Sequence, residues 1–190
     1  MKRDKQISKC IYDRVHKSPV LLFCSIVGAR YAIYVLGLMT VLIMPDVFPL
    51  FTPLSNDRII GLLQLVGAVW LITFLLQILV RRKRPFECKL YEAHIPLVCK
   101  TPSFPSAHSS MSFALVVISV KDLFWWSSNI SHITPFTTWI GICVFFLYAA
   151  WIAVSRVAVG VHYVSDVVVG SVLGFVLPLV IVFLAFTYGS

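Results

Sequence analysis

Long apolar segments alternate with short polar ones along the 190 residues of this chain. Five of the apolar segments are long enough for a helix to cross the hydrocarbon core of a membrane, which takes about 20 residues. A lipid-exposed segment has to satisfy its backbone polar groups internally, so each is expected to be helical. The expected spans are residues 19–44, 59–80, 106–126, 136–154 and 167–188.

The composition supports a membrane protein. Hydrophobic residues make up 59% of the chain and charged residues 13%, with a mean hydropathy of +0.90, well above the range of soluble domains. We find no internal repeat or low-complexity tract. We therefore expect an all-α, polytopic membrane helix bundle of about five transmembrane helices, with a basic N-terminal arm over residues 1–18 and a single transmembrane domain over residues 19–190. No cleavable signal peptide is expected, because the first apolar run follows a long polar stretch.

Five crossings would place three polar regions on one face of the membrane: the N-terminal arm, residues 81–105 and residues 155–166. Of the 16 Lys and Arg residues, six lie in the arm and six in the second region. One interpretation is topological, since basic loops stay cytoplasmic and attract anionic headgroups. The other is a binding site for an anionic substrate at this interface. The two interpretations are compatible.

Polar residues on this face form three clusters. They are RRKRPFE (residues 81–87), SFPSAHSS (103–110) and SRVAVGVHYVSD (155–166). Arginine offers a planar fork of donors that matches phosphate oxygens. Ser106 and the backbone N–H groups of Ala107 and His108 would begin a helix, where open donors and the helix dipole favour an anion. The residue types therefore predict a phosphate site.

The histidines suggest a reaction. His162 and Asp166 are four residues apart, so they share one face if the last helix extends back to His162, and the carboxylate can then hold one ring nitrogen. This makes His162 a candidate nucleophile and His108 a candidate general acid. A lone histidine in a membrane protein is often only a polar interhelical contact. Two histidines with an aspartate and two arginines favour catalysis.

A metal or other cofactor is not expected. No third carboxylate or cysteine stands at ligand spacing from the two histidines, and the neighbouring arginines would repel a cation.

The three clusters resemble the three-part signature of the type 2 phosphatidic acid phosphatase (PAP2) family of membrane lipid phosphatases. The third part, Ser-Arg, five residues, His, three residues and Asp, is matched in full by Ser155, Arg156, His162 and Asp166. The second part is matched by Pro105, Ser106 and His108, with Ala107 in place of the usual glycine. The first part is matched by Arg84 and Pro85, with Gln77 in place of a lysine.

This resemblance implies a metal-independent mechanism. His162 would attack phosphorus to give a phosphohistidine, His108 would protonate the departing oxygen, and Asp166 would orient His162. The expected contacts to the substrate phosphate come from Arg84, Ser106, Ala107, Arg156 and Gln77. Gln77 lacks the family's positive charge, which Arg81, Arg82 or Lys83 would replace unless the pocket suits a different phosphate.

The five spans, the Arg84-Pro85-Phe86 run and the His162-Tyr163 pair resemble the small bacterial undecaprenyl diphosphate phosphatases of the family. The implied partners are a lipid phosphate or diphosphate and the surrounding membrane lipids, with no role for nucleic acid. Phosphatidylglycerophosphate, phosphatidate and lipid A phosphatases share the same motifs. A noncatalytic lipid-headgroup binder or transporter on this scaffold is an alternative of another class. The oligomeric state is left open.

Two signals in the sequence disagree about which side of the membrane the site faces. The resemblance implies a bacterial cytoplasmic membrane with the active site at its outer face, whereas the basic bias places this face in the cytoplasm. A first apolar segment that is re-entrant or lies on the surface would change the topology. Cys88 and Cys99 would be able to pair in an oxidising compartment and would stay reduced in the cytoplasm.

Overall fold

The computed structural model describes residues 2–44, 56–95, 101–130 and 133–188. Within these residues the chain forms seven helices and no strand, which confirms the all-α helix bundle. The helices are α1 (Lys2–His16), α2 (Pro19–Arg30), α3 (Ala32–Leu42), α4 (Asn56–Val80), α5 (Ala107–Asn129), α6 (Pro135–Ala158) and α7 (Val164–Tyr188).

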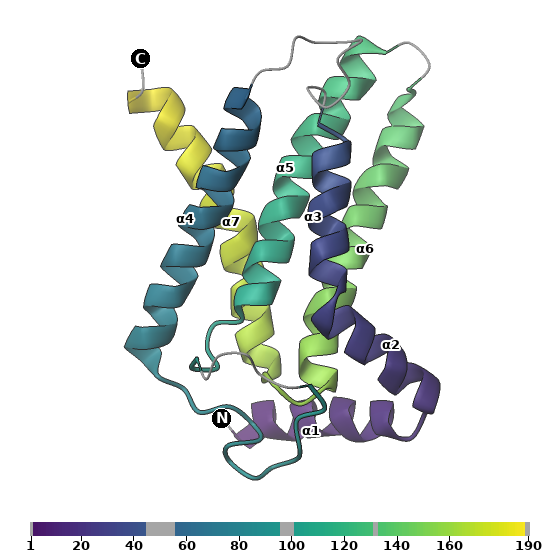
Figure 1. The fold of residues 1–190 in the computed structure, drawn as a ribbon, viewed down its shortest axis with the longest axis vertical. Coiled ribbons are helices and arrows are strands. Elements are labelled where there is room, and N and C mark those ends of the chain that lie inside the picture. The colour runs from purple at the N-terminus through teal and green to yellow at the C-terminus, as the bar shows by residue number, and fades with distance from the viewer. Residues whose placement is uncertain (1, 45–55, 96–100, 131–132, 189–190) are drawn as a thin grey trace.

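Four helices, α4 to α7, are long and apolar enough to cross a membrane, and α2 with α3 makes a fifth span if the pair is counted as one. The predicted first span is therefore divided, with a bend of 56° between α2 and α3. Tyr31 lies at the bend and ends α2 with a hydrogen bond from its N–H to the Val27 carbonyl. Below the bend α2 leans onto α6, and above it α3 runs beside α5 and α6 (Figure 1).

Local signals explain where several helices begin. The side chains of Ser18, Ser106 and Thr134 each accept a hydrogen bond from the first turn of the helix that follows, so they act as N-caps. Pro19 and Pro135 then occupy the first helical positions, where their missing N–H costs no hydrogen bond. The cap at Ser106 fixes the start of α5 at the second sequence cluster.

Helix α5 is the centre of the bundle. It contacts α3, α4, α6 and α7, and half of its most apolar stretch is buried, against 17% for α4. A Cβ atom at Gly170 of α7 would come within 2.5 Å of the Ser106 carbonyl oxygen, and one at Gly174 would overlap the carbonyl of Ser110. The two glycines therefore let α7 lie directly against the backbone of α5, as the GxxxG spacing permits.

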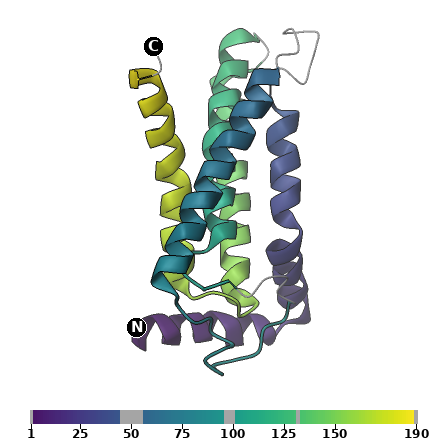
Figure 2. The same ribbon diagram turned by 60° about the vertical axis from the view of Figure 1, so that its left-hand side comes forward.

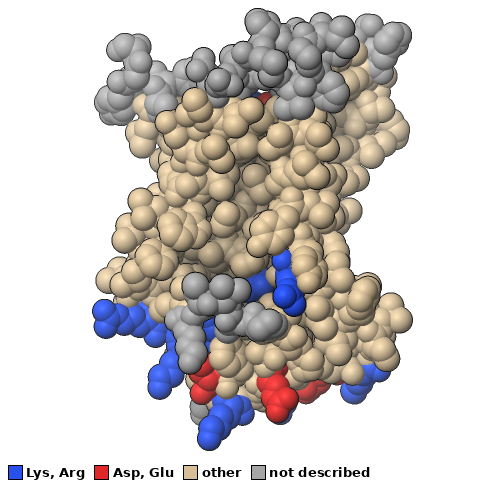
Figure 3. Space-filling model, in the orientation of Figure 1, with Lys and Arg blue, Asp and Glu red and all other residues tan. Residues whose placement is uncertain are grey.

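Helix α1 lies across one end of the bundle, where Figures 1 and 2 both show it running under the membrane-spanning helices. It contacts α2, α6 and α7. Ser8 on α1 is fully buried, and Ile11 packs against apolar side chains of α6 and α7. The predicted basic arm is thus a helix docked on the bundle, and Lys and Arg side chains gather at this end of the molecule (Figure 3).

Candidate active site

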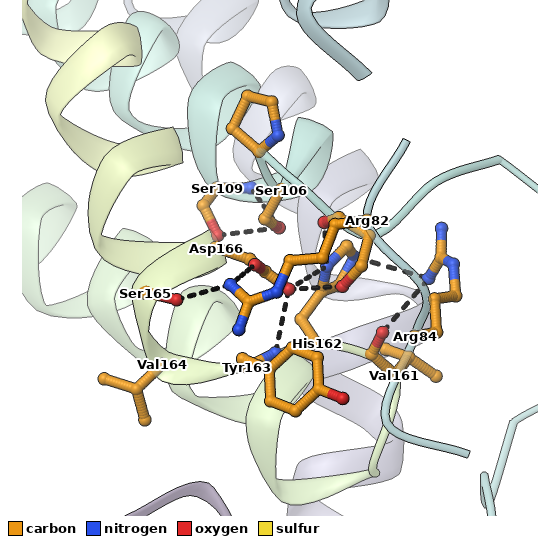
Figure 4. Close-up of polar contacts among 12 residues, drawn as sticks. Arg82, Arg84, Ser106, Ser109, Val161, His162, Tyr163, Val164, Ser165 and Asp166 are labelled. Atoms are coloured by element: carbon orange, nitrogen blue, oxygen red, sulfur yellow. Dashed lines mark hydrogen bonds and ion pairs between the residues drawn. The ribbon is translucent and has the colours of Figure 1, made fainter. Parts of the chain in front are cut away.

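The three sequence clusters meet at the end of the bundle covered by α1. The loop after α4 contributes Arg84, and the turn between α6 and α7 contributes His162 (Figure 4). The end of α6 contributes Arg156. The start of α7 contributes Asp166, and the start of α5 contributes Ser106. All five side chains are at most 4% exposed. The bundle therefore gathers the predicted residues into one buried polar site.

His162 lies outside any helix, because α7 begins at Val164. The condition considered from the sequence, a last helix that extends back to His162, is therefore not met. The reason is the carboxylate of Asp166, which accepts a hydrogen bond from the N–H of Tyr163 at 2.9 Å and so caps the first turn of α7. His162 and Asp166 still face one another across this cap, with 3.6 Å between Nδ1 and Oδ2.

The imidazole of His162 is held in one tautomer. Its Nδ1 lies 2.8 Å from the carbonyl oxygen of Ser103, which can only accept, so Nδ1 carries the proton and Nε2 carries the lone pair. Burial lowers the pKa of His162 to about 4, an effect that Asp166 opposes and that Arg84 and Arg156 reinforce. The ring is therefore neutral near pH 7, with Nε2 free to act as a nucleophile.

Two buried arginines lie close enough to His162 to influence its charge. Nη1 of Arg84 lies 3.5 Å from Nε2 of His162, and the guanidinium also binds the backbone and side-chain oxygens of Thr101 and the carbonyl of Val161. Burial lowers the pKa of Arg84, while Glu87 and Asp166 favour its charged form.

Arg156 donates from Nη1 to the Ala29 carbonyl at 2.7 Å. Its Nε is buried and finds no hydrogen-bond partner among the described residues. An unpaired donor on a buried cation is costly unless an anion binds there. The site is thus suited to an anionic group.

The start of α5 completes the site. The backbone N–H of Ser106 donates to the Asp166 carbonyl at 2.9 Å, which ties α5 to α7. Ala107 is the first residue of α5, and a helix leaves its first N–H groups without intrahelical partners. His108, the second residue of α5, lies near enough to Arg156, His162 and Arg84 to interact with them electrostatically.

Gln77 lies in the last turn of α4 and is 3% exposed. Its Nε2 donates to the carbonyl of Pro105 at 2.8 Å. The structure therefore places Gln77 beside the turn that presents Ser106, where it braces the backbone with at least one of its amide hydrogens.

Sequence reasoning treated Arg82 only as a replacement charge and overlooked Asp4. Arg82 donates from Nη1 to Asp166 and to Ser165, each at 2.6 Å, and from Nη2 to Asp4 at 2.6 Å. Its guanidinium also lies 4.1 Å above the ring of Tyr163. The available signal was Asp4 itself, one of two acids, with Asp13, in an arm that is mainly basic.

Among the described residues, no group of three or more His, Cys, Asp or Glu side chains is placed to hold a metal ion. Cys88 is exposed, and the pairing considered for it with Cys99 cannot be followed, since Cys99 lies outside the described residues.

Comparisons with known proteins support the fold. Two solved structures share the fold. A transmembrane PAP2 type phosphatidylglycerolphosphate phosphatase from Bacillus subtilis is 21% identical, with a TM-score of 0.72 over 98% of this chain and 86% of the other. LpxE from Aquifex aeolicus is 18% identical, with a TM-score of 0.58 over 94% of this chain and 93% of the other.

No curated protein matches the sequence closely enough to be counted as a relative. Residues 58–189, more than half of the sequence, match the PAP2 superfamily. The match includes all three clusters that build the site, and the chain therefore belongs to the PAP2 superfamily.

Proposed function

We propose that the protein is an integral-membrane lipid phosphatase that works through a phosphohistidine on His162. The observation that carries the proposal is the buried, neutral imidazole whose free Nε2 lies beside Arg84, with an unpartnered donor on Arg156 in the same site. Membership of the PAP2 superfamily supports the same chemistry.

In the first step, Arg84, Arg156 and the N-terminus of α5 would hold the substrate phosphate. Nε2 of His162 attacks phosphorus while the bond from phosphorus to the leaving oxygen breaks, and His108 donates a proton to that oxygen. The phosphorylated ring carries a positive charge, which the carboxylate of Asp166 stabilises.

In the second step, a water molecule gives a proton to His108 and attacks phosphorus. The bond between phosphorus and Nε2 breaks, the electron pair returns to His162, and inorganic phosphate leaves. His108 is again protonated for the next cycle. The two arginines supply the charge that stabilises both transition states, so this mechanism uses no metal or other cofactor.

We propose a polyprenyl diphosphate, such as undecaprenyl diphosphate, as the substrate. An apolar cavity of about 880 Å³ lies among α4, α5, α6 and α7. It is lined on α4 by Gly61 and Ala68, which precede Gln77 by 16 and 9 residues. At about 1.5 Å per residue these positions lie roughly 24 and 14 Å along the helix from the site, a distance that suits a long hydrocarbon tail.

The proposed location is the outer face of a bacterial cytoplasmic membrane, as the family resemblance suggests. Some of the basic residues at this end serve the site rather than topology: Arg82 and Arg84 bind protein groups inside it. Cys10 on α1 is exposed and reports the side directly. A membrane-impermeant maleimide applied to intact cells should label it, whereas labelling only after lysis would place the site in the cytoplasm.

The test is phosphate release by the purified protein in detergent with a chelator present. The substrates are undecaprenyl diphosphate, phosphatidylglycerophosphate, phosphatidate and lipid A, each also given to His162→Ala and to the control His94→Ala, an exposed histidine. We expect release that survives chelation, is fastest with the polyprenyl diphosphate and is lost only in His162→Ala. Binding of these lipids without release by the unmodified protein would instead indicate a headgroup binder or transporter.

A further inference from the structure

Helix α1 reaches the active site through one acidic side chain. We propose that Asp4 is a positioning residue, which holds Arg82 against Asp166 and so keeps the carboxylate aligned with His162. The effect of Asp4 on turnover rests on the proposed function. Helix α1 thereby belongs to the catalytic apparatus rather than to a basic arm at the membrane surface.

A continuous chain of contacts carries the inference. Oδ2 of Asp4 lies 2.6 Å from Nη2 of Arg82, and Oδ1 of Asp166 lies 2.6 Å from Nη1 of the same guanidinium. The other oxygen of Asp166 faces Nδ1 of His162 and accepts hydrogen bonds from Ser103 and from the N–H of Tyr163. One arginine thus joins a carboxylate on α1 to the carboxylate beside the proposed nucleophile. Figure 4 shows the contact between Arg82 and Asp166.

Asp4 also caps α7. Ser165 donates to Asp4 from its backbone N–H at 3.1 Å and from its hydroxyl at 2.7 Å, and the N–H of Val164 donates to Ser8 on α1 at 3.0 Å. The first N–H groups of a helix need such acceptors, and a negative charge there is favoured by the helix dipole. Helix α1 therefore fixes the first turn of α7, the turn that carries Asp166.

Charge explains why both carboxylates are needed. Burial acts to raise the pKa of Asp4, but the bonds from Ser165 and Arg82 outweigh it and hold that pKa below its usual value, so Asp4 is ionised. Asp166 is fully buried, whereas the side chains of Arg82 and Asp4 are 15% and 17% exposed. Without the anion at Asp4, the guanidinium keeps only its partners at the start of α7 and is free to turn toward solvent. Asp166 would then lose a fixed counter-ion and its orientation.

The test compares matched variants of the full-length protein. Asp4→Asn removes the charge with little change in shape, Asp4→Glu restores it, and Asp13→Asn makes the same charge change at an exposed site on α1. We expect Asp4→Asn to lower kcat for phosphate release about tenfold with KM within about twofold, because a misplaced catalytic group acts on the transition state. Asp4→Glu should recover most of the loss, and Asp13→Asn should behave as the unmodified protein.

A double-mutant cycle shows whether Asp4 acts through Arg82. The variant Asp4→Asn with Arg82→Gln should lose less kcat than the product of the two single losses, because both changes remove the same ion pair. Only the part of the Asp4 effect that comes from its bonds to Ser165 should add to the loss in Arg82→Gln. Multiplicative losses would overturn the inference, as would an unchanged kcat in Asp4→Asn.

Hydrogen exchange gives a readout that does not need turnover. In Asp4→Asn the amide of Ser165 should exchange at least about tenfold faster than in Asp13→Asn, because its acceptor on Asp4 has been weakened. If the unmodified protein released no phosphate from any lipid, the proposed function would be wrong. The exchange comparison would still show whether Asp4 stabilises the first turn of α7. Equal exchange in the two variants would overturn the role of Asp4 by itself.

Discussion

The carbonyl oxygen of Ser103 lies 2.8 Å from Nδ1 of His162, closer than Oδ2 of Asp166, which lies 3.6 Å away. The backbone therefore fixes the tautomer of the imidazole, and no side-chain substitution removes this carbonyl. The effect of Asp166 on His162 is therefore electrostatic: the carboxylate balances the charge that His162 gains when it is phosphorylated. This division of labour makes the effect of changing Asp166 predictable.

Asp166→Asn should lower kcat about 10²-fold, less than the loss of about 10⁴ seen where an aspartate alone holds the tautomer of a catalytic histidine. The amide loses the charge opposite the phosphohistidine, but Ser103 keeps Nδ1 protonated. Steady-state phosphate release measures the effect. A loss as large as that in His162→Ala would show that the Ser103 carbonyl does not hold the ring unaided.

Gln77→Leu should lower both stability and kcat. The change leaves the buried carbonyl of Pro105 without its donor, which costs about 1–3 kcal/mol, and frees the turn that presents Ser106. We expect a lower midpoint of thermal unfolding and a kcat reduced about tenfold. Gln6→Leu is the matched control, because Gln6 is an exposed residue on α1 and does not line the apolar cavity. Equal effects in the two variants would rule out the bracing role.

His162 should make the protein less stable in acid. Its folded pKa of about 4 is lower than the ordinary value of 6.5, so between these two values the unfolded chain binds a proton that the folded protein does not. Stability must then fall as the pH decreases through this window, by at most about 1.4 kcal/mol per pH unit. Thermal unfolding of His162→Gln at pH 7.5 and pH 5 should show a smaller acid-induced decrease than the unmodified protein. An identical decrease would contradict the lowered pKa.

Gly174→Ala should destabilise the bundle by at least about 1–3 kcal/mol, because the new methyl group would overlap the carbonyl of Ser110 and push α7 away from α5. Gly67→Ala is the control, since a Cβ atom there meets no other atom within 4 Å. Thermal unfolding in detergent compares the two. If both variants unfolded at the same temperature, the close contact between α5 and α7 would be wrong.

Ala68→Trp should discriminate substrates by chain length. The indole would fill part of the apolar cavity, where Ala68 lies roughly 14 Å along α4 from Gln77. We expect KM to increase for undecaprenyl diphosphate and to stay unchanged for a water-soluble short-chain prenyl diphosphate. Leu79→Trp places the same ring on a lipid-exposed position of α4 and should alter neither value. An equal rise in KM for both substrates would remove the cavity from the tail-binding pathway.

Much of this fold could be predicted because the membrane itself sets the length and apolarity of each span. The site clusters could also be predicted. Each is a short run of residues, and counting the membrane crossings places all three on the same face. The bend at Tyr31 could not, because no proline marks the break and the contact of α2 with α6 cannot be read from local sequence. The spacing of His162 and Asp166 fits either a helix or a capped turn, and only the bond from Tyr163 to Asp166 decides between them.

The link between Asp4 and Arg82 escaped prediction for a different reason. The two residues are far apart in sequence, and their contact depends on α1 folding back beneath the bundle. Charge counting treats the arm as a uniformly basic surface, so it misses the one acid whose environment is internal.

The bent first span has a consequence for how this sequence can diverge. Gly28 on α2 is in such close contact with Ser155 that a side chain at residue 28 would overlap the serine hydroxyl, and the next residue, Ala29, holds Arg156 through its carbonyl. Residues 28 and 29 precede the segment that matches the PAP2 superfamily, yet they pack against its third motif. Because Ser155 belongs to that motif, homologues that keep both the motif and this bend should keep a glycine at position 28. The third motif therefore constrains which residues the first span can carry, although the two segments are far apart in the sequence.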